Sequence, residues 1–344
     1  MNRRRVLIVC GGPDNEHEVS LRTGKNVFDN IDRELFDPQL CLINKHERWY
    51  TLEESNLPNI AEWPRAEFVP LTYDDSLSCF DTGNYDVVFN ALHGKYGEGG
   101  RLQCILDQAR VRYTGSGLTA SAICMDKRLT NRIIQSSVRD VQVPAELAIN
   151  TNLDWPILVD FLQKKVTGEK IVLKSATDGS SFNVFIVSKN DSAVPSLIRK
   201  ILDLGETALV QEFIEGLEVT CPVLGSGDNL EALPVGQIEY PGEWFDYEAK
   251  YSGKAVETFP ADSLDSQAQF ALRLISEVVH KTLGCRGLTR SDFILSKSKK
   301  LYFLEINTSP GMTAQSLCPQ SAYAHGWTYS ELVTRIIESA YASK

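Results

Sequence analysis

The sequence of 344 residues contains no Cys-x-x-Cys pair, no His-x-x-x-His pair and no apolar run long enough to cross a bilayer. Its eight cysteines are scattered. This spacing indicates neither a metal site nor a disulfide framework, so we expect small core residues in a reducing cytosol. The lack of paired histidines argues against a zinc enzyme.

The common phosphate-binding fingerprints are also missing. The opening "CGGPDNEHEVS" lacks Gly-x-Gly-x-x-Gly, which excludes a dinucleotide site, and no Gly-Lys-Ser/Thr follows the loop "ATDGSSF". Basic residues are in deficit, and the net charge of −10 disfavours nonspecific nucleic-acid binding. The basic start "MNRRRVLIVC" has no small-residue cleavage site after its short apolar run, so we interpret it as a first β-strand.

The length suits two or three domains, and 43% hydrophobic with 23% charged residues is typical of a soluble globular protein. Up to residue 117, apolar strands alternate with helical spacing, which predicts a parallel sheet with crossover helices. Ligands collect at the carboxyl ends of such strands, where Glu16, His93 and the turn Gly94–Gly100 fall. We expect strands within 4–12, 85–94 and 111–117, and helices over 16–31 and 100–110.

After residue 117 the pattern changes. One helix is expected over 119–137, followed by two strands around a Gly-Ser loop over 169–187. A third region of strands begins near Ala208, with a long helix over 266–284 and a closing hairpin over 290–307.

The closing hairpin, "RSDFILSKSKKLYFLEIN", carries polar residues inside apolar runs. If residues 298–299 form a two-residue turn, Asp292 lies opposite Glu305 and Ile294 lies opposite Phe303. The register therefore predicts two carboxylates that face each other across the hairpin.

Asp292, Glu305 and Asn307 would then share one face, because side chains alternate along a strand. Opposed carboxylates repel unless they are neutralised, and one interpretation is a Mg²⁺ ion held together with nucleotide phosphates. The other interpretation is a solvated strand face with the asparagine opening a turn. The Ser-Pro-Gly that follows favours the first, since glycine lets the backbone approach an anion.

Three further stretches bear on this choice. Lys174 lies inside the apolar run "IVLKSA", and a lysine in a buried strand needs an anionic partner such as a phosphate. Lys127 is weaker evidence, because lysines on helix surfaces are common. The loop over 176–182 either covers phosphates or is an ordinary hairpin turn, and its pattern alone favours the turn. The mixed stretch over 246–253 is typical of a lid.

Together these stretches resemble the D-alanine–D-alanine ligases, members of the ATP-grasp superfamily. The likeness runs almost from end to end in the family's order, and its specificity lies in the set rather than in any single block. The blocks are "GGPDNEHEVSL", "ALHGKYGEGGRLQ", "YTGSGLTASAICMDK", "KSATDGSSFNV", "FIEGLEVTCPVLG", "DYEAKY", "CRGLTRSDFIL" and "LEINTSPGMTAQSLCPQSA".

The resemblance implies an α/β fold that is α+β in its ATP-binding part. A Rossmann-like parallel-sheet domain would span 1–115, a central ATP-grasp domain 116–210 and a C-terminal ATP-grasp domain 211–344. ATP would lie between the sheets of the last two and phosphorylate the carboxylate of one D-alanine. The amine of a second D-alanine would attack that acylphosphate, and the dipeptide would serve peptidoglycan precursor synthesis.

The resemblance also carries functional roles onto matching positions. The metal ligands, for two Mg²⁺ or Mn²⁺ ions, would be Asp292, Glu305 and Asn307. ATP would be bound by Lys127, Lys174, Ser180, Gln211, Glu212, Ile214, Glu218, Lys250 and Asn307. The amino acids would be bound by Glu16, His93, Ser316 and Leu317. Catalysis would fall to Arg290 and the Gly311 N–H at the oxyanion, and to the hydrogen-bonded set of Ser180, Tyr251 and Glu16 that closes a lid.

The chain departs from the family pattern at four positions, which are either among these residues or close to them in sequence. Gln211 stands where a glutamate near adenine is usual, which predicts a weaker adenine contact. Ser175 replaces a proline, Asp178 a glutamate and Gly99 an aspartate. Tyr251 is the residue that resembles dipeptide-forming members, whereas depsipeptide-forming relatives commonly carry phenylalanine there.

We therefore expect a cytoplasmic enzyme, by family likeness a homodimer, that uses ATP and D-alanine and has no nucleic-acid or membrane partner. Two alternatives stay open. One is a ligase of the same chemistry that joins a different amino-acid pair. The other is a nucleotide-binding relative that has lost catalysis, against which the intact Arg290, Ser316 and Tyr251 argue.

Overall fold

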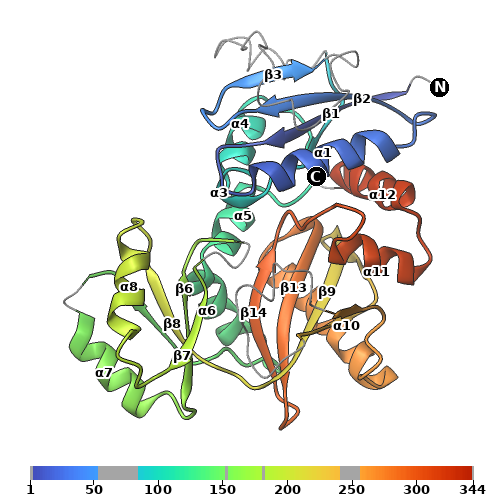
Figure 1. The fold of residues 1–344 in the computed structure, drawn as a ribbon. Coiled ribbons are helices and arrows are strands. Elements are labelled where there is room, and N and C mark those ends of the chain that lie inside the picture. Colours follow the sequence, from blue (N-terminus) through green and yellow to red (C-terminus); the bar gives the residue numbers. More distant parts are fainter. Residues whose placement is uncertain (1–2, 53–83, 152–153, 180–182, 241–255, 343–344) are drawn as a thin grey trace.

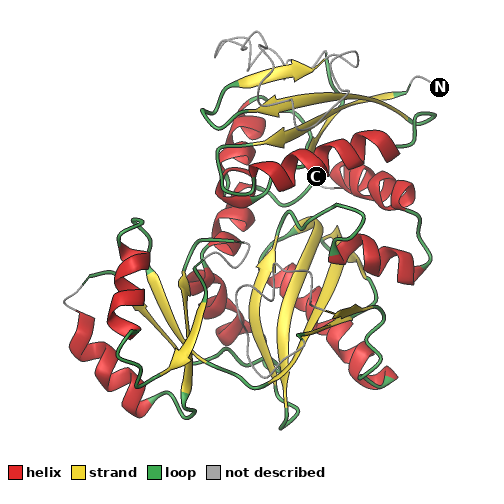
Figure 2. Cartoon of the chain, in the orientation of Figure 1, coloured by secondary structure: helices red, strands yellow, loops and turns green. Residues whose placement is uncertain are grey.

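The computed structural model describes residues 3–52, 84–151, 154–179, 183–240 and 256–342. Their strands form three sheets, which follow one another along the chain (Figures 1 and 2). A mixed α/β fold with one parallel-type sheet and two antiparallel sheets is confirmed. The domain limits near residues 115 and 210 stay a prediction.

The first sheet has the strand order β3-β2-β1-β4, and β1 runs parallel to both β2 and β4. Val6 and Ile8 of β1 pack into one core while Leu7 and Val9 pack into another, so helices cover both faces, as parallel sheets require. The elements are β1 (Arg4–Gly11), α1 (His17–Asn30), β2 (Phe36–Ile43), β3 (Trp49–Leu52), β4 (Val87–Asn90), α3 (Gly94–Glu98) and α4 (Arg101–Gln108). The strand expected over 111–117 is only a single bridge between Val88 and Tyr113.

The single helix expected over 119–137 is wrong, because the chain forms α5 (Leu118–Met125) and α6 (Lys127–Ser137) instead. Asp126 between them has extended backbone angles, and its side chain accepts a hydrogen bond from the N–H of Arg128. An aspartate that caps a new helix in this way ends the preceding one. The break also places Lys127 at the start of α6, where its N–H donates to Ala176 O, just after β6 (Lys170–Ser175) of the second sheet.

The second sheet is antiparallel, with the order β5-β8-β6-β7. Its elements are β5 (Glu146–Ile149), α7 (Trp155–Lys164), β6 (Lys170–Ser175), β7 (Phe185–Ser188), α8 (Val194–Leu202) and β8 (Ala208–Glu212). The predicted pair of strands over 169–187 corresponds to β6 and β7. The stretch that begins at Ala208 does not start a new sheet, because β8 pairs with β5 and β6.

The third sheet is also antiparallel, with the order β12-β11-β9-β13-β14 and β10 paired to β9. Its elements are β9 (Gly216–Ser226), β10 (Asn229–Ala232), β11 (Gly236–Glu239), β12 (Val256–Thr258), α10 (Ser266–Thr282), β13 (Arg286–Ser296), β14 (Leu301–Asn307), α11 (Leu317–His325) and α12 (Tyr329–Ala342). The last helix, α12, packs beside the first strand and the first helix, because Leu332 and Ile336 share the core of β1 and α1 (Figure 1).

The hairpin of β13 and β14 pairs Asp292 with Glu305, as predicted. Its turn differs, because the chain turns over three residues, 297–299, and a register shift at Phe293 follows. The predicted pairing of Ile294 with Phe303 is therefore wrong. The shift is a β-bulge, which adds one residue to β14 and changes which side chains face the cleft.

No helix in the described part of the chain is long and apolar enough to span a membrane.

Candidate active site

A cleft of about 1090 Å³ lies where the three sheets meet. Its walls come from the central sheet and the third sheet, and its far end comes from the turns that follow β1 and β4. This is the carboxyl end of the parallel strands, where ligands of such sheets collect. The cleft lining includes the predicted residues Glu16, His93, Lys127, Lys174, Gln211, Glu212, Ile214, Glu218, Arg290, Asp292, Glu305, Asn307, Gly311, Ser316 and Leu317.

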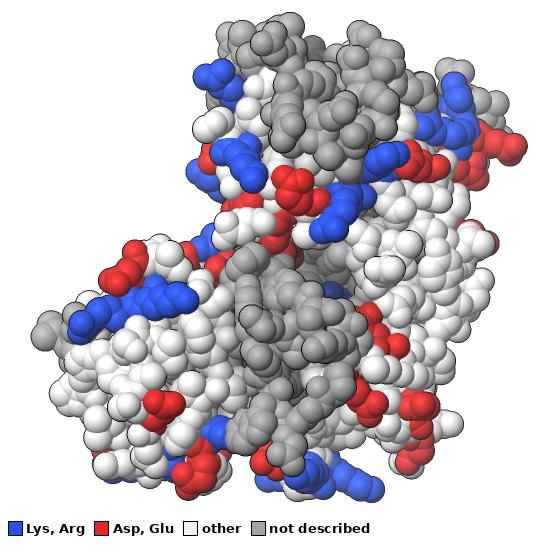
Figure 3. Space-filling model, viewed as in Figure 1, with Lys and Arg blue, Asp and Glu red and all other residues white. Residues whose placement is uncertain are grey.

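Three predicted site residues lie outside the described part of the chain: Ser180, Lys250 and Tyr251. Their roles remain those implied by the sequence. On the face drawn in Figure 3, Lys and Arg are interspersed with Asp and Glu and form no large field of one sign.

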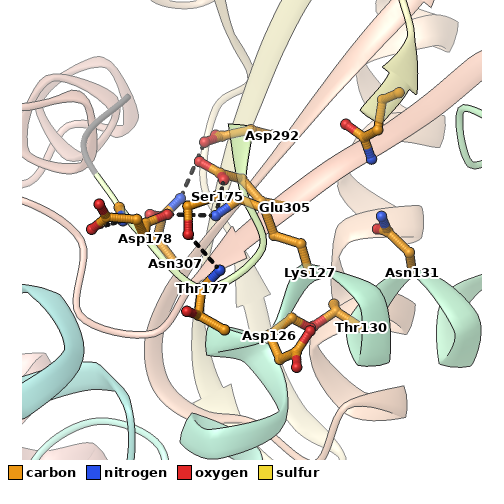
Figure 4. Close-up of polar contacts among 12 residues, drawn as sticks. Asp126, Lys127, Thr130, Asn131, Ser175, Thr177, Asp178, Asp292, Glu305 and Asn307 are labelled. Carbon is orange, nitrogen blue, oxygen red and sulfur yellow. Dashed lines mark hydrogen bonds and ion pairs between the residues drawn. The ribbon is translucent and has the colours of Figure 1, made fainter. Parts of the chain in front are cut away.

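The carboxylates and the amide of the hairpin converge on one wall of the cleft (Figure 4). Asn307 donates from Nδ2 to Asp292 Oδ2 over 3.1 Å, and Lys127 Nζ lies 3.2 Å from Glu305 Oε2. Register explains the gathering, because Asp292 is directly opposite Glu305, and Asn307 is two residues further along the same strand. The predicted shared face is confirmed.

Asp292 accepts hydrogen bonds from Arg290 and Thr220 as well as from Asn307. Arg290 donates from Nε to Oδ1 over 2.9 Å and from Nη2 to Oδ2 over 2.7 Å, and Thr220 Oγ1 donates to Oδ1 over 2.6 Å. Burial opposes the charge of Arg290, but the neighbouring Asp292 carboxylate outweighs it and raises the pKa of Arg290. The Arg290 guanidinium thus stays protonated and fixed inside the cleft.

Lys127 connects the hairpin to the central sheet. Its backbone N–H donates to Ala176 O over 3.0 Å, and its Nζ donates to Asp178 O over 2.7 Å while it pairs with Glu305. Only 9% of the Lys127 side chain is exposed, so this is a buried cation and not a helix-surface lysine. An ammonium fixed between a loop carbonyl and a carboxylate is well placed to contact a bound anion.

The end of the cleft farthest from the first sheet is formed by the second sheet, which we also call the central sheet. Gln211 and Glu212 end β8, Ile214 follows it, and Lys174 on β6 is paired in register with Leu209 of β8. Glu218 comes from the third sheet, on β9. The described residues that are predicted to contact adenine, ribose and phosphate therefore all line the same cleft.

The turn after β14 reaches the end of the cleft near the first sheet. A Cβ at Gly311 would lie 2.8 Å from Ser316 Oγ, so any larger residue would displace the Ser316 hydroxyl. Thr313 donates from its backbone N–H to Ser316 Oγ over 3.1 Å. Leu317 begins α11, so its N–H belongs to a helix N-terminus, which favours anions.

Glu98, which sequence reasoning missed, is a half-buried acid beside Glu16. It accepts hydrogen bonds from the N–H of Gly94 over 3.0 Å and from the N–H of Ser309 over 3.2 Å. Burial, followed by the charge of Glu16, raises the pKa of Glu98 to about 8. The carboxyl thus joins the turn after β4 to the turn after β14. An acid among the glycines of "GEGG" was the signal that could have revealed it.

His93 makes a second connection between the same two turns. Its Nδ1 lies 2.9 Å from Ser309 O and its Nε2 lies 2.9 Å from Thr23 Oγ1. Burial, with a smaller contribution from Arg290, lowers the pKa of His93 to about 4, although the bond to Ser309 O opposes the shift. A neutral ring that donates from Nδ1 and accepts at Nε2 satisfies both contacts.

Acid is expected to weaken the fold through His93. The pKa is about 4 in the folded chain and near 6.5 when unfolded, so the neutral ring favours folding above pH 6.5 and this contribution is lost as the pH falls towards 4. The loss is on the order of 3 kcal/mol in the free energy of unfolding. Denaturant unfolding at pH 7 and pH 4.5 should show a smaller acid loss in His93→Asn than in the wild type. Equal losses would contradict the assignment.

A second contact missed by sequence reasoning anchors the loop after β6. Glu206 pairs with Lys95 of α3 and accepts hydrogen bonds from Ser175 Oγ over 3.0 Å and from Thr177 Oγ1 over 2.6 Å. Burial opposes the charge of Glu206, but the hydrogen bonds from Lys95, Thr177 and Ser175, together with the charge of Lys95, outweigh it and lower the pKa of Glu206. Ser175 therefore helps to anchor this loop through Glu206.

Glu206→Gln is expected to raise the KM for ATP about three- to ten-fold with little change in kcat, because it weakens one charge-assisted contact that orders a loop of the cleft. Initial rates at varied ATP concentration would measure the split. Asp160→Asn, which removes an exposed pairing with Lys164 on α7, is the matched control. An unchanged KM for ATP in Glu206→Gln would show that this loop has no role in nucleotide binding.

A cleft shared by two antiparallel sheets is the arrangement by which ATP-grasp enzymes enclose a nucleotide, and the chain is an ATP-dependent ligase of that class. Sequence comparison narrows the class. The model described as "D-ala D-ala ligase N-terminus" matches residues 5–116, and "D-ala D-ala ligase C-terminus" matches residues 161–338. The chain belongs to the D-alanine–D-alanine ligase family.

Relatives that align over nearly the full length of the chain belong to the same family. A D-alanine–D-alanine ligase of Carboxydothermus hydrogenoformans is 35% identical over 340 residues, which cover 97% of each chain. D-alanine–D-alanine ligase A of Escherichia coli K12 is 32% identical over 358 aligned residues, which cover 99% of this chain and 96% of that one.

Solved structures share the fold. The VanG D-Ala:D-Ser ligase of Enterococcus faecalis superposes with a TM-score of 0.83 at 26% identity, covering 98% of this chain and all of that one. The D-alanine–D-alanine ligase of Bacillus anthracis, complexed with ATP, gives a TM-score of 0.74 at 26% identity, with 99% and 98% covered.

Proposed function

We propose that the protein joins two D-alanine molecules into D-alanyl-D-alanine with ATP, through an acylphosphate, for peptidoglycan precursor synthesis. Family membership over nearly the whole chain supports the activity. A carboxylate is a poor electrophile, whereas its acylphosphate has a good leaving group. The reaction therefore needs positioning and charge neutralisation more than a protein nucleophile.

ATP lies along the cleft in this proposal, with its base at Gln211, Glu212 and Ile214, and its ribose at Glu218. Lys127 and Lys174 contact the phosphates, and Lys250, outside the described residues, is proposed to do the same. The support is local, since both described lysines line the cleft and Lys127 is held there by its backbone and its ammonium.

The metal ligands are proposed to be Asp292, Glu305 and Asn307. Two carboxylates and an amide oxygen are hard donors that suit Mg²⁺ or Mn²⁺. No group of three or more His, Cys, Asp or Glu that could hold a metal occurs among the described residues, so phosphate oxygens and water would have to complete the coordination of two ions. When bound, the ions would neutralise the charge of the transferring phosphate.

The two amino acids occupy the end of the cleft near the first sheet. Glu16 pairs with the ammonium of the first D-alanine, beside His93, which orders the neighbouring turn. Ser316 and the N–H of Leu317 bind the carboxylate of the second. Arg290 and the N–H of Gly311 stabilise the oxyanion that forms when the amine attacks the acylphosphate. Ser180 and Tyr251 are proposed to close this end with Glu16 and to exclude water.

One observation carries the proposal. Arg290, Asp292, Glu305, Asn307 and Lys127 converge on one wall of a cleft, although they come from a helix and two strands. The test is ADP release across a panel of D- and L-amino acids, with the dipeptide identified by mass. Turnover that requires D-alanine and yields D-alanyl-D-alanine supports the proposal, and no turnover with D-alanine would end it.

A second candidate function is the ligation of D-alanine to D-serine. Its support is the high structural similarity to the VanG D-Ala:D-Ser ligase. The same panel separates the two, because this candidate requires a mixed dipeptide to predominate when both amino acids are present. ATP binding without phosphate release for any acceptor would instead favour a relative that has lost catalysis.

We also propose that the enzyme acts in the cytoplasm as a homodimer. All described cysteines are free thiols, and Cys124 and Cys285 share a hydrogen bond over 3.7 Å between their sulfur atoms and no disulfide. This supports a reducing compartment, where ATP is also available. The dimer rests on family likeness, and sedimentation at micromolar concentration would test it.

A further inference from the structure

A buried polar cluster beside the base end of the cleft joins Gln211 to Glu146 and Asn131, two residues that have no role in the function proposed so far. Glu146 on β5 is directly opposite Gln211 on β8, so the two side chains share one face of the central sheet. Gln211 donates from Nε2 to Glu146 Oε2 over 2.8 Å, and Asn131 of α6 donates from Nδ2 to the same oxygen over 2.7 Å. Both amides are about 98% buried or more.

The chemistry of Glu146 determines how the Gln211 amide is oriented. A carboxylate can only accept hydrogen bonds, so the amino group of Gln211 has to face it. The carbonyl oxygen of Gln211 then points away from Glu146, and Gln211 lines the cleft.

We propose that Glu146 is a positioning residue for base recognition, because it holds Gln211 so that Oε1 presents an acceptor to the exocyclic amino group of a purine. Such an acceptor pairs with the 6-amino group of adenine and opposes the 6-keto oxygen of hypoxanthine. Glu146 thereby selects ATP over inosine triphosphate without touching the nucleotide. The inference rests on the proposed function, since it requires a nucleotide base at this end of the cleft.

The pair also explains why a glutamine replaces the glutamate that is usual at residue 211. Two carboxylates directly opposite each other on neighbouring strands would repel. With Glu146 present, a glutamine supplies the acceptor without that repulsion. The sequence predicts a weaker adenine contact from the missing charge, whereas the structure supports a contact whose direction is fixed by a second residue.

Glu146→Gln tests the orientation. A neutral amide at residue 146 no longer forces the amino group of Gln211 towards it, so Gln211 can turn and offer N–H to the base. We expect kcat/KM for ATP to fall about ten-fold and the preference for ATP over inosine triphosphate to fall by a similar factor, the scale of one hydrogen bond. The kcat at saturating ATP should change little, because the base is remote from the transferring phosphate.

Two further variants test whether residues 146 and 211 act as a pair: Gln211→Glu alone, and Glu146→Gln combined with Gln211→Glu. Gln211→Glu alone opposes Glu146, and we expect its kcat/KM for ATP to fall about ten-fold, although it restores the family's usual residue. In Glu146→Gln combined with Gln211→Glu, the amide donor and the carboxylate exchange places. Recovery of the ATP preference to within about three-fold of the wild type would show coupling, whereas additive losses would overturn the proposal.

Glu169→Gln is the matched control, because it removes one exposed carboxylate beside the same sheet without lining the cleft. Calorimetric titration of wild-type protein with ATP alone separates two failures. Absence of ATP binding would overturn the proposed function, whereas ATP binding with an unchanged ATP-to-inosine-triphosphate ratio in Glu146→Gln overturns only this inference. Should Glu146→Gln fail to fold, Gln211→Glu decides, and undiminished ATP affinity in that variant contradicts the proposal.

Discussion

Replacing Glu305 with alanine is expected to abolish ligation while leaving the fold intact. Glu305 lies opposite Asp292 on the cleft wall beside the proposed phosphate path, and its loss removes both a proposed metal ligand and a partner of Lys127. Loss of fixed charge stabilisation at a phosphoryl-transfer site costs about 10³-fold in kcat or more. Steady-state ADP release in excess Mg²⁺ would measure it.

The stability of Glu305→Ala should change by less than about 1 kcal/mol in the free energy of unfolding, because the Glu305 side chain is 34% exposed and solvent screens its pairing. Lys127 also keeps its bond to Asp178 O, so no buried cation is left without a partner. Glu215→Ala is the matched control, since Glu215 makes an exposed pair with Lys297 at the other end of the hairpin. Near-normal turnover in Glu305→Ala would refute the metal assignment.

The sequence was sufficient where local rules decide the structure. The pairing of Asp292 with Glu305 follows from the hairpin and from strand alternation, and the structure confirms this pairing. The bulge next to it could not be predicted, because one extra residue in β14 depends on how the hairpin packs against β9. Its consequence is that Leu304 and Glu305, neighbours in sequence, both line the cleft.

Other features depend on residues far apart in the chain. Glu98 acts through the N–H groups of Gly94 and Ser309, and Glu206 acts through Lys95, which is 111 residues away. No periodicity encodes such contacts. The break at Asp126 is different, because an aspartate before a helical run is a local cap signal that could have been read from sequence.

Replacing Arg290 is expected to depress kcat by about 10²- to 10³-fold with a much smaller effect on KM, because the oxyanion develops only as the amine attacks. The guanidinium donates two hydrogen bonds to Asp292, so it is in place before the reaction and needs no reorganisation. Rates at varied D-alanine concentration, with ATP saturating, give the two constants separately. An effect confined to KM would argue for a role in binding alone.

The choice of substituent decides what this experiment reports. Arg290→Ala leaves Asp292 buried without its bidentate partner, which costs about 3–5 kcal/mol in stability and confuses a catalytic loss with an unfolded fraction. Arg290→Lys keeps a positive charge near Asp292 but loses the planar fork that fixes its direction. If direction matters, kcat should fall in Arg290→Lys while the melting temperature stays near that of the wild type. A lysine variant with wild-type kcat would show that charge alone is sufficient and that the fork has no catalytic role.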